Sequence, residues 1–323
     1  MRIHTKVTEG LGIQIPVIQG GLAYLAYSKL AAAVSNAGGL GQITAMSLPD
    51  EKALQLEIKA VKSLSSRPFG VNFAIGQHGR PYEHMLEAAI EEGVKVISIT
   101  GGNPAPFIKK LDKTGIKTLV LVSSVRQAQK AEESGADFIM AVGQEGGGHI
   151  GRADTGTIAL IPRVVEAVSL PVIASGGIVD GKGLAAALSL GAEGIEMGTR
   201  FIAASECEHA HPAYKQAILD GSEEDTVVIK RSLGAPGRAV YTPFIEKILE
   251  MEKESHGFEE LKDYISGEAN RKYIHEGREK EGFGWAGQGM GGIKEVLSAS
   301  EILRRLESEA IKVLSELQQR IKR

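Results

Sequence analysis

The chain has 323 residues, of which 43% are hydrophobic and 24% charged, a composition typical of a globular protein with a large core. Its formal net charge of -3 lacks the basic excess that a nucleic-acid-binding surface needs. Its single cysteine, Cys207, excludes a disulfide framework and fits a reducing compartment. No apolar run approaches the roughly 18 residues that span a bilayer, and the N-terminus lacks an apolar signal core. We therefore expect a soluble, cytoplasmic protein that binds neither nucleic acid nor a membrane.

Short β-branched runs recur along the first two thirds of the chain, separated by alanine-rich helical patterns. The predicted strands cover residues 15–19, 40–43, 69–73, 96–100, 118–122, 138–142, 172–175 and 194–197. The clearest predicted helices between them cover residues 28–36, 81–92, 124–134 and 182–190, and several end in glycine. Alternating strands and helices indicate a parallel sheet, and eight such units indicate a closed (β/α)8 TIM barrel rather than the alternative, an open doubly wound sheet.

The pattern changes after the eighth predicted strand. We expect a (β/α)8 barrel domain at 1–205, a mostly helical excursion at 206–285 that forms a small substrate lid, and a segment at 286–323 that packs back on the barrel. That last segment carries a predicted helix over residues 300–323 whose alternating charges are typical of a solvated face.

Glycines cluster directly after predicted strands, where the active sites of such barrels lie. Ser175-Gly176-Gly177 follows the seventh strand, and Gly198-Thr199 follows the eighth. In these barrels, backbone N–H groups of these two loops and a helix N-terminus bind phosphate. Two such loops in consecutive units favour a phosphate-bearing ligand over ordinary tight turns.

The loop after the sixth strand holds the best candidate for catalysis. It runs from Gln144 through Glu145 and three glycines, the last of which is Gly148, to His149. Histidine suits general acid–base chemistry because its unperturbed pKa, about 6.5, lies near neutral pH. The glycines indicate close packing against a flat cofactor. Glu145 is open to three interpretations: it positions the loop, binds a cation, or is solvated.

Two further predicted strands end at the same open end of the barrel. Gly20, Gly21 and Leu22 follow the first strand, and Asn72 ends the third; their backbone and amide groups could hydrogen-bond the edge of a heteroaromatic ring. Cys207 is interpreted as a bystander thiol. His209 and His211 lack the further ligands that a metal site needs, so we expect no metal there and a structural turn ahead of Pro212.

These motifs resemble the 2-nitropropane dioxygenase or nitronate monooxygenase family of FMN-dependent barrels, which includes flavin-dependent enoyl-acyl-carrier-protein reductases. The resemblance covers residues 15–42 and 123–218 and resumes at 286–288. Its most specific elements are the runs at 146–151, 171–178 and 198–201.

The resemblance implies FMN, with its phosphate at Gly176, Gly177, Gly198 and Thr199 and its ring near Gly20, Gly21, Leu22, Asn72 and Gln144. It also implies that His149 is the acid or base beside the flavin. In nitronate-oxidising members such a histidine assists proton removal from the carbon that bears the nitro group. In the enoyl reductases NADH or NADPH reduces the flavin, which then reduces an enoyl thioester on acyl carrier protein. A homodimer is a further expectation.

Two departures separate this chain from many nitronate-oxidising members. Gly20-Gly21-Leu22 stands where they carry Ala-Pro-Met, and Ile150 stands where they carry arginine after the histidine. Both features, with the segment at 211–215, are closer to the enoyl reductases. From the sequence we place nitronate oxidation first and enoyl reduction second. Two alternatives are an IMP-dehydrogenase-like barrel, which needs a cysteine where His149 stands, and a non-catalytic phosphate-binding barrel.

Overall fold

The computed structural model describes residues 2–76 and 81–321, and its centre is an eight-stranded parallel sheet in the order β1-β9-β8-β6-β5-β4-β3-β2. A parallel bridge between Ile18 and Leu40 joins the two ends of this order and closes the barrel. The strands are β1 (Val17–Gln19), β2 (Gly41–Thr44), β3 (Phe69–Ala74), β4 (Val96–Thr100), β5 (Lys117–Val122), β6 (Phe138–Val142), β8 (Val172–Ser175) and β9 (Gly194–Met197). The predicted (β/α)8 barrel is confirmed, and the open sheet is excluded.

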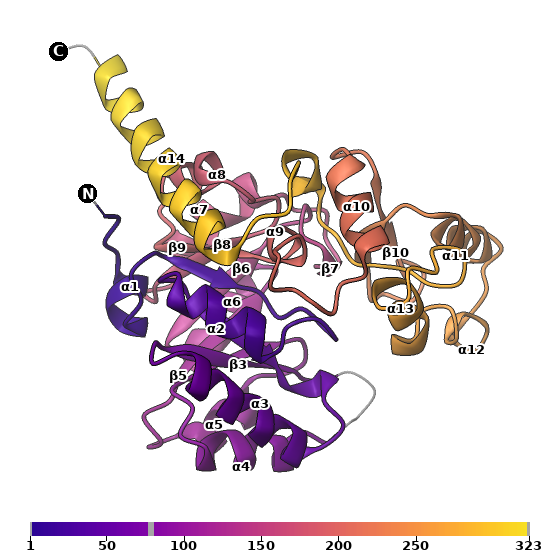
Figure 1. The fold of residues 1–323 in the computed structure, drawn as a ribbon, viewed down its shortest axis with the longest axis horizontal. Coiled ribbons are helices and arrows are strands. Elements are labelled where there is room, and N and C mark those ends of the chain that lie inside the picture. Colours follow the sequence, from indigo (N-terminus) through magenta and orange to yellow (C-terminus); the bar gives the residue numbers. More distant parts are fainter. Residues whose placement is uncertain (1, 77–80, 322–323) are drawn as a thin grey trace.

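Helices connect the strands and cover the outside of the barrel (Figure 1). They are α2 (Ser28–Asn36), α3 (Glu51–Leu64), α4 (Glu83–Glu91), α5 (Ala105–Leu111), α6 (Val125–Glu133), α7 (Thr157–Ala167) and α8 (Gly181–Ser189), with the 3₁₀ turn η1 (Ala45–Ser47) after β2. Local capping sets several starts: the Asp50 carboxylate accepts from Ala53 N before α3, and the Ser124 hydroxyl accepts from Gln127 N before α6.

The barrel interior is apolar at its N-terminal end. There Ile18, Leu40 and Phe138 form one buried cluster with Val7 and Leu11 of the short helix α1 (Lys6–Leu11). Helix α1 therefore closes the bottom of the barrel, and the open end is the one where the strands terminate.

The segment after β9 begins with α9 (Thr199–Ile202) and then leaves the barrel, lying to the right in Figure 1. It contains α10 (Pro212–Asp220), β10 (Thr226–Ile229), β11 (Gly237–Val240), α11 (Pro243–Lys253), α12 (Phe258–Leu261) and α13 (Gly267–Ile274). The excursion has its own apolar core, which includes Ile245, Leu261 and Phe283.

The excursion also holds an antiparallel sheet that we did not predict. Its strand order is β10-β11-β7, where β7 (Gly148–His149) comes from the loop after β6. The β-branched run Thr226–Ile229 was the local signal for β10. No local signal marks β7, because a two-residue strand exists only through its pairing with β11.

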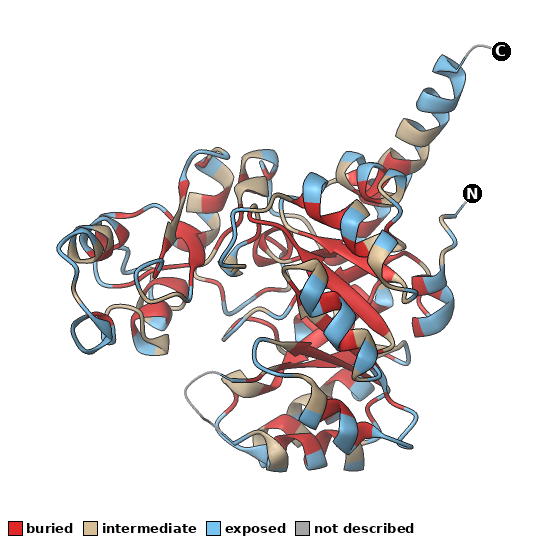
Figure 2. Ribbon diagram, turned by 180° about the vertical axis from the view of Figure 1, so that it is seen from behind, coloured by how far each residue is buried: buried red, intermediate tan, exposed pale blue. Residues whose placement is uncertain are grey.

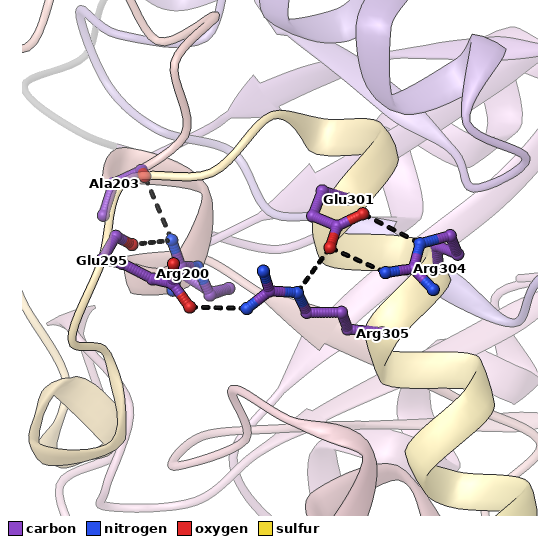
Figure 3. A network of polar contacts seen from close by, with 6 residues as sticks. All are labelled: Arg200, Ala203, Glu295, Glu301, Arg304 and Arg305. Carbon is purple, nitrogen blue, oxygen red and sulfur yellow. Dashed lines mark hydrogen bonds and ion pairs between the residues drawn. The ribbon is translucent and has the colours of Figure 1, made fainter.

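The chain returns through η2 (Gln288–Gly292) to the long helix α14 (Ala299–Arg320), the counterpart of the predicted helix, whose last residues lie outside the described ranges. Arg200 fixes this return by donating to the carbonyl oxygens of Ala203 and Glu295, and Arg305 pairs with both Glu295 and Glu301 (Figure 3). Figure 2 shows the barrel strands buried and the last turns of α14 exposed. Within the described ranges, no helix combines the length and apolar character that crossing a membrane requires.

Candidate active site

Polar side chains replace apolar ones where the barrel interior opens. Side chains two residues apart on a strand face the same side, so Gln42, Asn72, Ser98, Ser175 and Glu196 continue the interior face of their strands toward the mouth. Asn72 Nδ2 donates to Ser98 Oγ at 2.9 Å, and Ser175 also hydrogen-bonds the Glu196 carboxyl. Hydrogen-bonding groups thus line the base of the open end of the barrel, and all five side chains are buried.

Glu196 is a residue of this group that our sequence analysis missed. Its side chain is buried, and that burial raises the pKa of the carboxyl, while the hydrogen bond from Ser175 acts in the opposite direction. A Cβ atom added to Gly20 would lie 3.0 Å from Glu196 Oε1, so the carboxyl lies directly against the loop after β1. In the sequence, Glu196 could have been recognised as a site candidate because it is a charged residue inside an otherwise apolar strand.

The first-strand loop contacts the other predicted flavin-binding segments. A Cβ atom on Gly21 would lie only 2.3 Å from Asn72 Oδ1, so any larger residue there would displace the Asn72 side chain. The side chain of Leu22 lies beside Gly198, 3.4 Å from the position of an added Cβ. The structure therefore brings Gly20, Gly21, Leu22 and Asn72 together with the loop after β9.

The two predicted phosphate loops also lie beside each other, since β8 and β9 are neighbours in the sheet. Gly176 and Gly177 both have left-handed backbone, with φ of 99° and 74°. Thr199 Oγ1 accepts from Gly287 N at 3.0 Å, which leaves the proton of its hydroxyl for donation.

The N-terminus of α8, which we expected to help these loops bind phosphate, is already capped by side chains. The Asp180 carboxylate accepts from Gly183 N at 2.9 Å, and Glu309 Oε2 accepts from Gly181 N at 2.8 Å, so two carboxylates cap α8. Helix α9 has only four residues. Any anion at these loops depends on loop backbone and the Thr199 hydroxyl.

Gln144 and Glu145 hold the loop after β6 in place. Gln144 Nε2 donates to the carbonyl oxygens of Gly151, at 2.9 Å, and Ala153, while its buried Oε1 lacks a hydrogen-bond partner among the described residues. Both carboxylate oxygens of Glu145 accept from Thr157 N, at 3.0 and 2.9 Å, at the start of α7. Of the three interpretations of Glu145, the structure supports loop positioning.

The glycines before His149 pack against protein. A Cβ atom on Gly147 would lie 2.6 Å from the backbone of Ala286 and Gly287, whereas Gly148, with φ of 75°, has nothing within 4 Å of an added Cβ. This close approach explains why position 147 has no side chain. Packing of the glycine run against a flat cofactor stays a prediction.

His149 is held by two residues of the excursion. It pairs in β7 with Gly237 of β11, so it stands on a strand and not on the flexible loop we expected. Its Nε2 lies 2.7 Å from Nζ of Lys230, and its ring centroid lies 5.4 Å from that of Trp285. Burial lowers the pKa of Lys230 to about 8, with Glu252 acting against that shift. Sequence analysis missed both residues, because they are distant in the chain and carry no local motif.

The remaining candidates have structural roles. Cys207 is buried, and burial raises the pKa of its thiol to about 11. His211 is the N-cap of α10 and accepts from Ala213 N, which confirms the predicted turn ahead of Pro212. His209 packs edge-on against Tyr27. The described residues contain no group of three or more His, Cys, Asp or Glu side chains placed to bind a metal ion.

Comparison with known proteins identifies the family of this chain. A family model described as nitronate monooxygenase matches residues 4–309. A probable nitronate monooxygenase of Staphylococcus saprophyticus is 32% identical, over 89% of this chain and 92% of that protein. An octahydro-indene-carboxyl-CoA dehydrogenase of Mycobacterium tuberculosis is 38% identical, over 80% of this chain and 72% of that protein.

Among solved structures, FabK from Thermotoga maritima superimposes with a TM-score of 0.93 at 37% identity, covering 99% of this chain and 100% of that one. The barrel, the excursion and the returning C-terminal helix are thus all present in a solved relative. The chain belongs to the nitronate monooxygenase family of flavoprotein oxidoreductases.

Proposed function

We propose that this protein is an FMN-dependent oxidoreductase with His149 as its acid–base group, acting on a small-molecule substrate. The observation that carries the proposal is the pair of loops after β8 and β9. Gly176 and Gly177 expose backbone in a conformation that a side chain would strain, and the Thr199 hydroxyl retains a proton to donate. These features fit a monophosphate, and the chain has no dinucleotide motif that would hold the adenosine half of FAD.

The other end of the mouth fits a flavin ring. Gln144 Oε1 is a buried acceptor with no partner in the described ranges, and a ring N–H would satisfy it. When bound, FMN supplies the hydride and electron transfer that no protein side chain performs. We assign the phosphate to Ser175, Gly176, Gly177, Gly198 and Thr199, and the ring to Gly20, Gly21, Leu22, Asn72, Gln144 and Gly148.

As the activity we propose NAD(P)H-dependent reduction of an enoyl thioester, which reverses the order that we inferred from the sequence. FabK, a flavin enoyl-acyl-carrier-protein reductase, matches essentially the whole chain. The relative from Mycobacterium tuberculosis acts on a CoA thioester by its name. The first-strand loop Gly20-Gly21-Leu22 and Ile150 also depart from the nitronate-oxidising pattern.

Oxidation of alkyl nitronates by O2 is the second candidate. The family model and the curated relative from Staphylococcus saprophyticus both favour it. The two activities differ in the reductant of the flavin, which is NAD(P)H in one and the nitronate in the other. That difference makes them separable in one experiment.

The first test concerns the cofactor. Mass analysis of the group released from purified protein should find FMN and not FAD. Gly177→Val should abolish FMN binding, because a branched side chain strains the left-handed backbone of the proposed phosphate loop and its Cβ would lie 3.1 Å from Cβ of Glu145. Gly93→Val is the matched control, since Gly93 has a similar φ of 66° but an added Cβ there meets nothing within 4 Å. Full FMN occupancy in Gly177→Val would refute the assignment of the phosphate loops.

The second test concerns the activity. Under anaerobic conditions, NADH, NADPH and ethyl nitronate are each mixed with the oxidised protein, and bleaching of the flavin absorbance is recorded. We expect NADH or NADPH to bleach it and crotonyl-CoA to restore the colour. Bleaching by the nitronate alone would establish the second candidate instead.

A further inference from the structure

Lys230 is a buried lysine with a left-handed backbone. Its side chain is only 6% exposed. Its backbone has φ of 63°, a left-handed conformation that costs a non-glycine residue about 1 kcal/mol or more. Glu252 of α11 maintains this conformation, since its carboxylate accepts from Lys230 N at 2.8 Å and from Ser232 N at 3.0 Å. A buried, strained lysine that the fold actively maintains indicates a function.

The ammonium group of Lys230 has two partners at the mouth of the barrel. Nζ lies 2.7 Å from His149 Nε2 and 5.0 Å from the centroid of the Trp285 ring. Trp285 comes from the end of the excursion, so β7, the residue after β10 and this end converge on one contact. The imidazole itself is exposed while the lysine behind it is buried.

Among the residues that the structure describes, no charged side chain forms an ion pair with this ammonium. Glu252 of α11 faces the backbone of Lys230. Arg231, the next residue, is paired with Asp154 at 2.8 Å, and Arg238 of β11 donates to the carbonyl oxygen of Gln144 at 3.0 Å. The short contact that the structure records for Nζ is with His149 Nε2.

We propose that Lys230 is a positioning residue and proton source for His149: its ammonium holds the imidazole in the neutral form protonated at Nδ1 and returns a proton to Nε2 whenever Nδ1 gives one up. An ammonium nitrogen only donates, so Nε2 must accept, and the proton of a neutral imidazole then resides on Nδ1. A second positive charge on the imidazole is disfavoured by the adjacent ammonium. The inference rests on the proposed function, in which His149 acts on the substrate.

The proton balance of the step is complete. The Nδ1–H bond breaks as a C–H bond forms at the substrate carbon, and the Nζ–H bond of Lys230 breaks as an Nε2–H bond forms. Both residues end neutral, and solvent later reprotonates Lys230. The substrate also receives a hydride, which bound FMN supplies after reduction by NAD(P)H.

This arrangement specifies the direction of proton transfer and hence the substrate class. An imidazole whose Nε2 faces an ammonium is prepared to deliver a proton and poorly prepared to remove one. It suits activated alkenes, such as enoyl thioesters, in which the carbon next to the carbonyl must be protonated. Neutral nitroalkanes, which must lose a proton, are disfavoured, whereas an already ionised nitronate makes no demand on His149.

The test compares Lys230→Met and Lys230→Arg with Lys247→Met. Lys247 is a matched control because its Nζ also lies over an aromatic ring of the excursion, 4.8 Å from the centroid of Tyr264. In stopped-flow experiments, Lys230→Met should slow reoxidation of the reduced enzyme by crotonyl-CoA about 10- to 100-fold more than it slows reduction by NAD(P)H. Lys247→Met should match the wild type in both steps.

The pH dependence separates proton delivery from positioning. Wild-type reoxidation by crotonyl-CoA should slow as pH rises through about 8, where Lys230 loses its proton. Lys230→Met should be slow throughout and lack this limb. Lys230→Arg keeps a donor that does not titrate near pH 8, so the imidazole stays oriented but the proton is not delivered. A wild-type profile in either variant would refute the proposal.

A measurement that needs no turnover examines the imidazole itself. In protein labelled with 15N at its histidines, His149 should show the Nδ1–H tautomer in the wild type and in Lys230→Arg, and lose that preference in Lys230→Met. His149→Ala assigns the signal. Trp285, the one tryptophan of the chain, lies against both residues, so its fluorescence follows the same titration.

Failure of the inference and failure of the proposed function are distinguishable. If the wild type binds no flavin or does not reduce crotonyl-CoA, the proposed function is wrong, while the tautomer still shows whether Lys230 controls His149. If the wild type is an active enoyl reductase and the tautomer is unchanged in Lys230→Met, Lys230 only fills space and the inference is wrong.

Discussion

His149 carries the chemistry of the proposed site, and its backbone is fixed independently of its side chain by pairing with Gly237. His149→Ala should therefore retain FMN, because the proposed phosphate contacts lie in other loops. Turnover should fall by about 10²- to 10⁴-fold, the usual contribution of a positioned general acid or base. Flavin content and steady-state rates measure the two effects. Wild-type rates of this variant on every substrate would show that His149 is not the acid–base group.

Glu196 leads to a prediction about stability and pH. Burial raises the pKa of its carboxyl in the folded protein, so between the unfolded and folded values the folded state binds more protons. The free energy of unfolding therefore falls as pH rises through that window, which begins at the ordinary glutamate pKa of 4.5. Glu196→Gln should remove this loss and unfold at a higher temperature than the wild type at pH 8 but not at pH 4.

Thermal unfolding of the apoprotein across that pH range is the measurement, with the exposed Glu87→Gln as the control. A glutamine at position 196 that lowers the melting temperature at pH 8 would mean that the buried carboxylate is stabilised by a partner other than Ser175. In the sequence, Glu196 is only a charged residue within a predicted strand. Its burial depends on closure of the barrel.

At the scale of single elements, helix α7 begins after a glycine, which has no side chain to cap the helix. Its N-cap is Gly156, and the cap is supplied from the preceding loop by Glu145, which accepts from both the backbone N–H and the hydroxyl of Thr157. Glu145→Ala should lower the free energy of unfolding by about 1–2 kcal/mol, through loss of a cap and of a favourable charge at a helix N-terminus.

Urea unfolding measures this loss, and Glu166→Ala is the control, since Glu166 lies on the same helix in an exposed pair with Arg163. Addition of Mg²⁺, Ca²⁺ or K⁺ should not shift the melting temperature of the wild type through Glu145, because both carboxylate oxygens are occupied. A cation-dependent shift that disappears in Glu145→Ala would restore the cation-binding interpretation.

At the scale of the whole molecule, the excursion and the barrel share secondary structure. Strand β7 belongs to the barrel's loop in sequence and to the excursion's sheet in space. Arg238 donates to Gln144 across the junction at 3.0 Å, and Gln288 N donates to the carbonyl oxygen of Glu145 at 2.9 Å. The three segments that we expected from the sequence should therefore unfold as one cooperative unit.

Two probes test that cooperativity. Fluorescence of Trp285 reports the junction, and far-ultraviolet circular dichroism reports mainly the helices of the barrel. Their urea transitions should coincide in the apoprotein. A Trp285 transition at lower urea than the loss of helix would show that the excursion opens independently, as a mobile lid would.

The sequence by itself determined the barrel. Four strands were predicted with their observed bounds, at 96–100, 138–142, 172–175 and 194–197. A parallel strand buried on both faces is an apolar run, which can be recognised from neighbouring residues alone. The helix over 28–36 and the turn before Pro212 were likewise encoded in neighbouring residues. The glycines after the last two strands marked the proposed phosphate loops for the same reason.

Only the tertiary structure decided what surrounds His149. Lys230 lies 81 positions away in the chain, and Trp285 approaches from the end of the excursion. The sheet of β7, β10 and β11 and the packing of Gly147 on Ala286 also join distant residues. Such contacts leave no periodic trace in the sequence, because they depend on closure of the barrel and on the path of the excursion. The residue that we propose as acid or base could thus be predicted locally, while the lysine that we propose to set its protonation state is brought near only by the fold.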